Sequence, residues 1–268
     1  MGQGTFGEIK VFSDFTAPPL TVASGSVPLA LQENLGDGIG LIGVEEGAID
    51  FTVDEPGGVI AITTDTGDND NHALVAGCFK PADGGMEMEV RFKVVDSYAA
   101  ARAAVFIGFT ETLNLGTPVM PAETATATTT YNGTGGMVGM LFDSDSTSLV
   151  FRFVAGDAGA ALATVAGPKA TVPEGTVGGA VGISANMTLT ADRWYVARIE
   201  VGTDGKAVGY INDVQDSSVL KAVGKNTAAL GTGDSFHAIA MIENRSGANE
   251  ILEVDYFYAH GWRDWSAA

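Results

Sequence analysis

Hydrophobic and charged residues alternate along much of this chain, and the segment 86–94 shows the pattern most clearly. Its apolar positions are Met88, Val90, Phe92 and Val94, and its charged positions are Glu87, Glu89, Arg91 and Lys93. Side chains alternate between the two faces of a β-strand, so this segment predicts a strand with one buried face and one solvent-exposed face.

Other segments predict further strands from the same period of two. The segment 103–110 is apolar on both faces and predicts a central strand, and 136–143 and 149–154 flank a polar turn and predict a hairpin. The segments 193–201 and 206–212 flank Asp204-Gly205, and an Asp-Gly pair is a strong hairpin signal. We also expect strands at 236–243 and 251–259, and a long loop at 113–135.

Helical periodicity is nearly absent, so the pattern predicts an all-β jelly-roll sandwich of two antiparallel sheets. A chain of 268 residues can form one such domain. Residues 1–35, which contain Pro18-Pro19 and several Gly and Ser, are predicted to be an N-terminal arm and a first strand. Residues 36–268 are predicted to form the sandwich.

The chain is strongly acidic, with 33 Asp and Glu against 14 Lys and Arg and a formal net charge of −19. Such a surface repels phosphate backbones and anionic membranes, so we expect no nucleic-acid partner and no membrane partner. No apolar segment approaches the ~20 residues that a membrane helix needs. The first ten residues contain no apolar run typical of a secretory signal, so we expect synthesis in a cytoplasm.

Cys78 is the only cysteine, so the chain cannot form an internal disulfide. It lies in the apolar segment 75–79, which predicts a small buried hydrophobic residue. His72, His237 and His260 are scattered, and their spacing does not favour a zinc site.

An acidic cluster around Asp65, Asp68 and Asp70 is the best metal candidate, because Ca²⁺ takes six to eight oxygen ligands. The spacing is not that of an EF-hand loop, and no Glu follows at the right distance. A solvated acidic turn is therefore the preferred interpretation, and calcium is the alternative. Asp143 and Asp145 form a second pair, which we interpret as turn-forming residues.

Glu253 and Asp255 occupy alternate positions of the last predicted strand, as carboxylates do in the Glu-x-Asp-x-Glu or Glu-x-Asp-x-x-Glu strand of jelly-roll glucanases. Phe257 and Tyr258 stand where the third acid of that motif would be. Without it the protonation step of glycoside hydrolysis is lost. The chain also contains no nucleophile elbow and no phosphate-binding loop. We therefore predict no catalytic residues and no enzyme activity.

Three tryptophans could stack on sugars, but each has a simpler interpretation as a packing residue. Trp194 opens a predicted strand and is expected to lie in the core. Trp262 and Trp265 lie in the C-terminal tail and must pack on their own sandwich or on a neighbouring chain. Trp262, Trp265, Pro18 and Pro19 are therefore the predicted interaction residues.

Several motifs occur in a recognisable order. The segment 192–200 contains Trp-x-x-x-Arg-Ile-Glu, and Asp204-Gly205 connects it to Gly209-Tyr210-Ile211-Asn212. Asp213 stands where a Gly is usual. Over about residues 60–260 this arrangement resembles concanavalin A-like (laminin-G-like) jelly-roll domains, including structural proteins of tailed bacteriophages.

The resemblance implies a capsid decoration (cement) protein on the virion surface, synthesised in the host cytoplasm. Its implied partners are the major capsid protein and further copies of itself, with a trimer at a local threefold axis as the preferred assembly. Such a protein stabilises the assembled shell by mass action, because it binds the shell and not its separate parts. The resemblance implies no cofactor, and calcium is the one candidate ion.

Two other functions remain open. The first is a carbohydrate-binding, lectin-like module on a phage or cell surface, whose glycan binding would depend on Trp262 or Trp265. The second is a glycoside hydrolase or lyase, whose turnover of a β-glucan would depend on Glu253.

Overall fold

A computed structural model describes residues 8–13, 39–43, 48–52, 58–95, 102–113, 119–147, 149–162, 164–166, 183–184, 189–213, 221–226 and 230–262. Within these ranges the chain is almost entirely β-strand, and its one helix is the short 3₁₀ helix η1 at Pro81–Asp83. No helix in this part of the chain is long and apolar enough to span a membrane.

The strands form two large sheets, in which every pair is antiparallel, and a separate hairpin. Sheet A contains, in spatial order, β13 (Thr164–Ala166), β17 (Lys221–Asn226), β16 (Ala207–Asp213), β15 (Tyr195–Val201), β6 (Met86–Val95), β19 (Ile251–Trp262), β4 (Val59–Thr63) and β3 (Ala48–Thr52), with β1 (Glu8–Ser13) also paired to β19. Sheet B contains β12 (Ala160–Ala161), β11 (Arg152–Asp157), β10 (Met137–Asp143), β7 (Ala103–Thr110), β18 (Phe236–Asn244), β5 (Asn71–Phe79) and β2 (Ile39–Gly43), with β14 (Ile183–Ser184) paired to β11. The hairpin consists of β8 (Ala122–Ala125) and β9 (Thr128–Tyr131).

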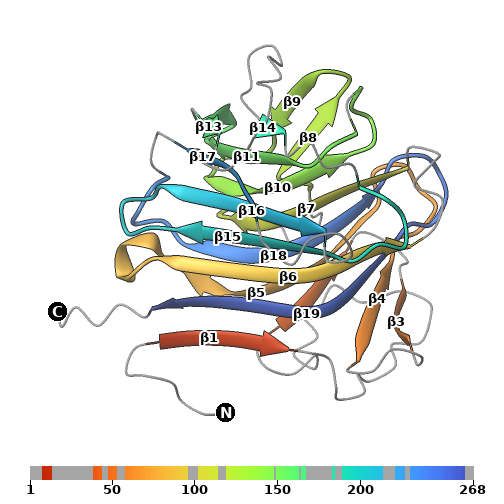
Figure 1. The fold of residues 1–268 in the computed structure, drawn as a ribbon, viewed down its shortest axis with the longest axis horizontal. Helices are drawn as coiled ribbons and strands as arrows, with labels where there is room; N and C mark the ends of the chain where they lie inside the picture. Colours follow the sequence, from red (N-terminus) through yellow and green to blue (C-terminus); the bar gives the residue numbers. More distant parts are fainter. Residues whose placement is uncertain are drawn as a thin grey trace.

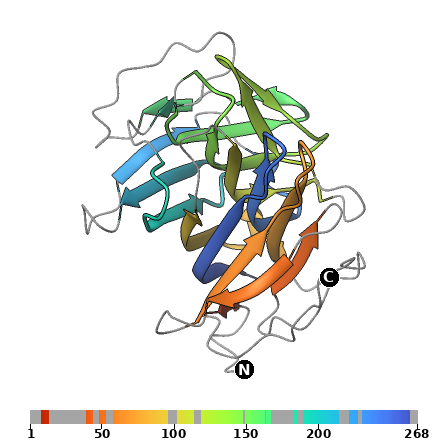
Figure 2. The same cartoon turned by 90° about the vertical axis from the view of Figure 1, so that its right-hand side faces the viewer.

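Figure 1 shows β16, β15, β6, β19 and β1 side by side, with strands of sheet B behind them. Figure 2, turned by 90°, shows the orange strands β3 and β4 at the end of the sandwich that faces the viewer. The 12-residue strand β19 pairs with β6 along one edge, and along its other edge β4 pairs with its first half and β1 with its second half.

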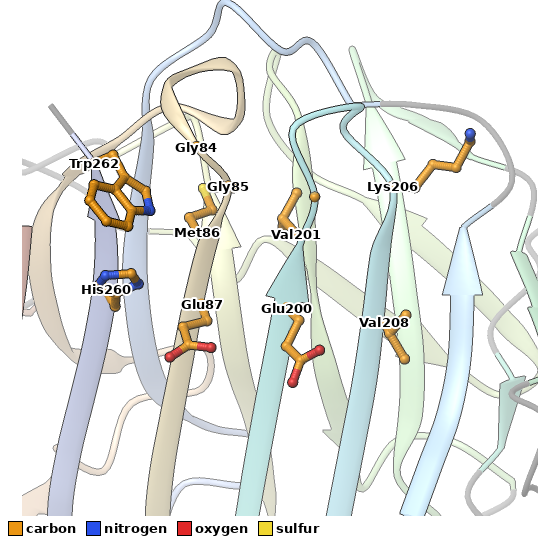
Figure 3. Close-up of a pocket in the computed structure, with 11 residues that line it drawn as sticks. Gly84, Gly85, Met86, Glu87, Glu200, Val201, Lys206, Val208, His260 and Trp262 are labelled. Carbon is orange, nitrogen blue, oxygen red and sulfur yellow. The ribbon is translucent and has the colours of Figure 1, made fainter. Parts of the chain in front are cut away.

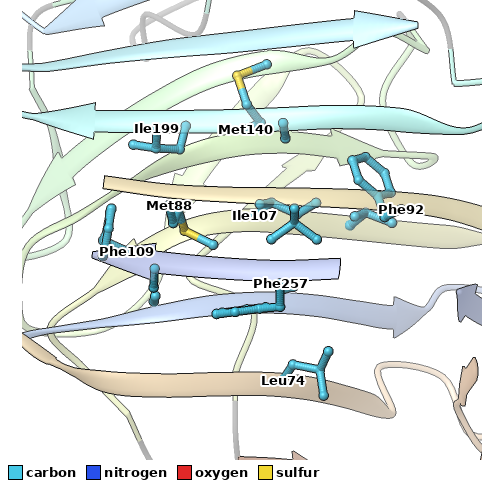
Figure 4. Close-up of a cluster of buried hydrophobic side chains, with 14 of the residues drawn as sticks. Leu74, Met88, Phe92, Ile107, Phe109, Met140, Ile199 and Phe257 are labelled. Carbon is cyan, nitrogen blue, oxygen red and sulfur yellow. The ribbon is translucent and has the colours of Figure 1, made fainter. Parts of the chain in front are cut away.

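The core lies between the inward faces of the two sheets and contains the residues that the period of two predicted. Figure 4 shows Met88, Phe92, Ile199 and Phe257 of sheet A against Leu74, Ile107, Phe109 and Met140 of sheet B. Each fully buried side chain of this size contributes about 1.5–3 kcal/mol. All eight residues of β7 are buried, as expected for a central strand, and the hairpin of β15 and β16 is confirmed.

A second apolar cluster lies on the other face of sheet B, beneath the hairpin of β8 and β9. Ala122 and Tyr131 of the hairpin pack there with Phe106, Leu141 and Met241. The expectation of a long loop at 113–135 is therefore wrong for 122–131. This segment contains Thr and Ala rather than large apolar residues, so its alternation is weak in the sequence, although β-branched Thr suits a strand.

Cys78 is exposed, contrary to the prediction that it is buried. Gly77 has a φ of 55°, and the pairing of β5 with β18 shifts register beside it. A bulge of this kind breaks the alternation of side chains, so Cys78 is exposed on the outer side of the strand. Phe79 then returns to the core, where it is fully buried.

Candidate functional site

The outward face of sheet A carries aromatic and charged side chains in rows that cross the strands. In one row the register places Lys10, His260, Glu87, Glu200 and Val208 on the five neighbouring strands β1, β19, β6, β15 and β16. Directly opposed side chains of neighbouring strands lie about 4.5–5.5 Å apart at Cβ, so they form a continuous surface.

The next row contains Phe12, Tyr258, Glu89, Arg198 and Tyr210 on the same strands. Arg198 links the charges of the two rows, because its Nη2 lies 2.8 Å from Glu200 Oε1 and 3.2 Å from Glu87 Oε2. Burial opposes the charge of Arg198, but Glu200 and its neighbouring carboxylates outweigh it and raise its pKa. The guanidinium therefore stays charged and fixes the carboxylates around it.

Strand β19 presents four aromatic side chains on this face, Tyr256, Tyr258, His260 and Trp262, which we call the aromatic stripe. Tyr258 and His260 are stacked, with ring centroids 6.5 Å apart and an interplanar angle of 4°. The ring of Trp262 meets His260 edge to face, at 5.5 Å and 77°. The four rings follow the alternation of one strand, so they form a line along the sheet.

The two tyrosines are tied to strand β6. Tyr256 donates its hydroxyl proton to Glu89 Oε1 at 2.6 Å, and Tyr258 donates to Glu87 Oε1 at 2.7 Å. Burial raises the pKa of Tyr256, and the adjacent Glu89 raises it further, so the phenol stays a donor. These hydrogen bonds hold both rings across the sheet face.

A groove of about 460 Å³ opens where the stripe reaches the end of the sheet. Six of the side chains that line it are Glu87, Glu200, Lys206, Val208, His260 and Trp262. Figure 3 shows Trp262 and His260 on one side of it, Glu87 and Glu200 in the middle, and Lys206 and Val208 on the other side.

The indole of Trp262 is positioned by the turn that precedes β6. Gly84 in that turn has a φ of 140°, and a Cβ at Gly84 would lie 2.4 Å from Trp262 Cδ1. Glycine is therefore required there both by the backbone conformation and by the close approach of the ring. The turn and the strand β19 together hold the indole at the rim of the groove.

This arrangement suits a ligand with hydroxyl groups and apolar C–H faces. Glu87 and Glu200 can accept hydrogen bonds from hydroxyls, and bonds to an ionised acceptor are the strong ones. An indole offers an apolar face with an N–H donor at its edge. The ammonium of Lys206 lies at the rim, 2.9 Å from Asp204 Oδ2. Fixed polar groups beside apolar surface are typical of small-molecule binding sites.

Trp194 does not lie in the core, contrary to the prediction. It is half-buried on the outward face, with the guanidinium carbon of Arg91 4.6 Å from its ring centroid and Lys93 Nζ 4.8 Å from it. The next residue, Tyr195, is the first inward position of β15 and is fully buried. Alternation therefore directs Trp194 outward, where it packs under the two cations.

Glu253 and Asp255, the two carboxylates of the glucanase-like motif, are both engaged by cations of β6. Lys93 Nζ lies 2.6 Å from Glu253 Oε2, and Arg91 is hydrogen-bonded to Asp255. Both carboxylates therefore serve as ion-pair partners on the surface of sheet A, and neither lines the groove described above.

The acidic side chains of the segment 65–70 differ in their burial and do not form a compact set of metal ligands. Asp65 is half-buried, Asp68 is exposed and Asp70 is buried, where burial raises the pKa of its carboxyl group. In the described part of the chain no three His, Cys, Asp or Glu side chains are arranged to hold a metal ion. Calcium binding by Asp65, Asp68 and Asp70 remains a prediction from the sequence.

A buried cation holds the loops at one end of sheet B. Arg245 contacts Glu243 Oε1 at 2.6 Å, Asp143 Oδ2 at 3.0 Å and Asn69 Oδ1 at 2.9 Å. Asp143 also accepts hydrogen bonds from the backbone N–H groups of Thr124 and Asp145, in line with its interpretation as a turn-forming residue. Arg245 thereby joins the ends of β10 and β18 and the loop before β5, and Asp143 connects them to the hairpin of β8 and β9.

Of the predicted interaction residues, Trp262 lines the groove, whereas Trp265, Pro18 and Pro19 lie outside the described residues. The sequence pattern did not indicate Glu87, Glu200 or His260 as members of a site. The signal that could have found the stripe is the alternation of aromatic residues from 256 to 262. It was missed because the last strand was expected to end at 259.

No protein-family model and no curated protein matches this chain. Solved structures do match over nearly its whole length. A protein of unknown function from Shewanella oneidensis MR-1 aligns with a TM-score of 0.57 and 14% identity, over 98% of this chain and 90% of that one. Peanut lectin aligns with a TM-score of 0.53 and 11% identity, over 94% and 97% of the two chains.

The CBM2 module of the evolved Dit of Lactobacillus casei BL23 phage J-1 is also similar, with a TM-score of 0.51 and 12% identity over 98% of this chain and 99% of that module. At these identities the likeness establishes the fold alone. The fold is the concanavalin A-like jelly roll of lectins, and the predicted fold class is confirmed.

Proposed function

We propose that this protein is a non-catalytic carbohydrate-binding module, and that it binds glycans in the groove at the Trp262 end of sheet A. The observation that carries this proposal is the combination of an indole, an imidazole and two anchored carboxylates in one groove of about 460 Å³. Glu87 and Glu200 share the guanidinium of Arg198, so they are in place before a ligand arrives and little ordering entropy is lost on binding.

The charge of the groove favours a polyhydroxylated ligand over a phosphate or a carboxylate. Glu87 and Glu200 stand in its middle, Lys206 is already paired with Asp204, and the whole chain carries a net charge of −19. An anionic ligand would meet like charges there, whereas sugar hydroxyls can donate to both carboxylates. The fold that this chain shares with peanut lectin and with a phage CBM2 module supports the same function.

The test is retention on insoluble cellulose, chitin and mannan together with binding to a glycan array. We expect binding that Trp262→Ala weakens by at least about tenfold, which corresponds to about 1.4 kcal/mol. Glu87→Gln should weaken it as well, because a charged acceptor is lost. Trp194→Ala is the matched control, since its indole lies on the same face outside the groove. Absence of binding to every glycan, or equal binding by Trp262→Ala, would contradict the proposal.

A second candidate function is a structural role for this module in a phage particle. Likeness to a phage CBM2 module over nearly the whole chain favours a structural protein of a phage particle. In this proposal the protein decorates the capsid as a cement protein, binds the major capsid protein as a homo-oligomer, preferably a trimer, and is synthesised in the host cytoplasm. A decoration protein can bind the shell with one surface and glycans with another, so the two functions are compatible.

Mass spectrometry of purified virions tests the second candidate. A copy number in fixed ratio to the major capsid protein supports the decoration role. Absence from the particles rules it out and leaves glycan binding untouched.

A further inference from the structure

We infer that the site takes a linear, uncharged polysaccharide that lies along β19 and β1, rather than a single terminal sugar. This inference rests on the proposed carbohydrate-binding function and adds the class of ligand. It is carried by surface features that continue from the groove to the far end of the aromatic stripe.

The stripe is longer than a groove for one sugar requires. Its first and last members, Tyr256 and Trp262, are six residues apart on a strand that is regular between them, because the register shift of β19 precedes Tyr256. At ~3.4 Å per residue the stripe extends for about 20 Å. A monosaccharide can contact one or two of these rings, whereas an extended chain can contact all of them.

Strand β1 continues the binding surface beside the stripe. Phe12 is 46% exposed, and its ring centroid lies 6.3 Å from that of Tyr256. Lys10 Nζ lies 5.3 Å from the ring centroid of Tyr258. Large side chains this exposed are rare here: Phe12 and Val119 are the two exposed large hydrophobic residues in the described ranges. An aromatic ring at the end of the stripe opposite Trp262 therefore provides apolar contact at a distance from the groove.

The rings are held in place before binding. Tyr256 and Tyr258 donate their hydroxyl protons to Glu89 and Glu87, and His260 is stacked on Tyr258. A rigid row of rings lets each additional sugar bind without the cost of ordering a side chain. Contacts in series along one chain then add to the affinity, as expected for linked binding units.

The charges beside the stripe select an uncharged chain. Glu87 and Glu89 lie on β6, the strand next to β19, and Glu200 lies one strand further on β15. Their shared cation Arg198 is already surrounded by carboxylates, so Lys10 on β1 is outnumbered by these three acids. Uronates or sulfated sugars laid along β19 would face these carboxylates, and like charges oppose binding. Neutral hydroxyls meet no such penalty.

The experiment is calorimetric titration of the full chain with cellulose, chitin and mannan fragments, from the disaccharide to the hexasaccharide. For the fragment series that binds, we expect affinity to rise with length by at least about tenfold, or about 1.4 kcal/mol, and then to level off. Polygalacturonate fragments of the same lengths should bind at least tenfold more weakly.

Two variants locate the chain. Phe12→Ala should reduce hexasaccharide affinity and leave disaccharide affinity unchanged, whereas Trp262→Ala should reduce both. Val119→Ala, which changes the other exposed hydrophobic residue, is the matched control and should change neither.

The possible results distinguish failure of this inference from failure of the proposed carbohydrate-binding function. Equal affinity for disaccharide and hexasaccharide, unchanged hexasaccharide binding by Phe12→Ala, or stronger binding of polygalacturonate would each overturn the inference while glycan binding stands. If no glycan binds at all, the proposed function fails and the inference fails with it.

Discussion

His72 is a buried histidine whose protonation should oppose folding. It is 1% exposed, and neither ring nitrogen has a hydrogen-bond partner in the described part of the chain. It lies on the same side of β5 as Leu74, which faces the core between the sheets. Burial lowers its pKa from 6.5 to about 4, since the imidazolium would lose its hydration there.

The sign of the pH effect follows from this difference. Between pH 6.5 and pH 4 the unfolded chain binds a proton at His72 that the folded chain does not bind. The stabilisation from a neutral His72 is therefore complete above pH 6.5 and is lost as pH falls toward 4. A pKa lowered from 6.5 to about 4 corresponds to about 3 kcal/mol in full, of which about 2.5 kcal/mol is lost by pH 4.5.

Urea unfolding of the wild type and of His72→Leu, followed by tryptophan fluorescence from pH 4.5 to pH 8, measures this contribution. Burial raises the pKa of Glu243 to about 7, which gives the wild type an opposite slope, so the difference between the two proteins is the quantity to follow. We expect the free energy of unfolding of the wild type, minus that of the variant, to fall by about 2.5 kcal/mol between pH 7.5 and pH 4.5. A difference that stays constant with pH would refute the reasoning.

Three further outcomes are expected. Gly84→Ala should displace the indole of Trp262, weaken glycan binding at least about tenfold in titrations and lower the stability by about 1–3 kcal/mol in melting experiments. Gly233→Ala is the control, because its new Cβ meets nothing within 4 Å, and it should change neither glycan binding nor stability. Arg245→Met should lower the free energy of unfolding in urea by about 3–5 kcal/mol, because it leaves buried carboxylates unpaired, and a loss below 1 kcal/mol would contradict this. If the segment 65–70 is a solvated turn, the melting temperature should be the same in calcium and in EDTA, and a rise of several degrees in calcium would establish an ion site.

The fold was predictable where large apolar residues alternate with charged ones. In β6 each Glu, Arg or Lys stands next to a Met, Val or Phe, so its two faces could be assigned before the pairing was known. The hairpin of β8 and β9 was not predictable in this way. Its residues are mostly Thr and Ala, and what makes it a hairpin is its packing on Phe106 and Leu141 of sheet B.

The candidate site depends on register, which a sequence without an alignment does not specify. Trp262 was indicated as an interaction residue from its type and its position in the C-terminal tail. Its neighbours Glu87 and Glu200 belong to strands that lie far apart in the sequence, and only the pairing of β19 with β6 and of β6 with β15 brings them to one groove. The exposure of Cys78 is also a consequence of pairing, because the bulge at Gly77 reverses the direction of its side chain.

The claim on which the account depends is that sugars contact the outward face of sheet A. A crystal structure of the protein with a bound neutral oligosaccharide tests it most directly. The account predicts sugar rings over Trp262 and His260 that continue along β19 toward Tyr256 and Phe12. An oligosaccharide bound elsewhere, for example beside the hairpin of β8 and β9, would contradict it.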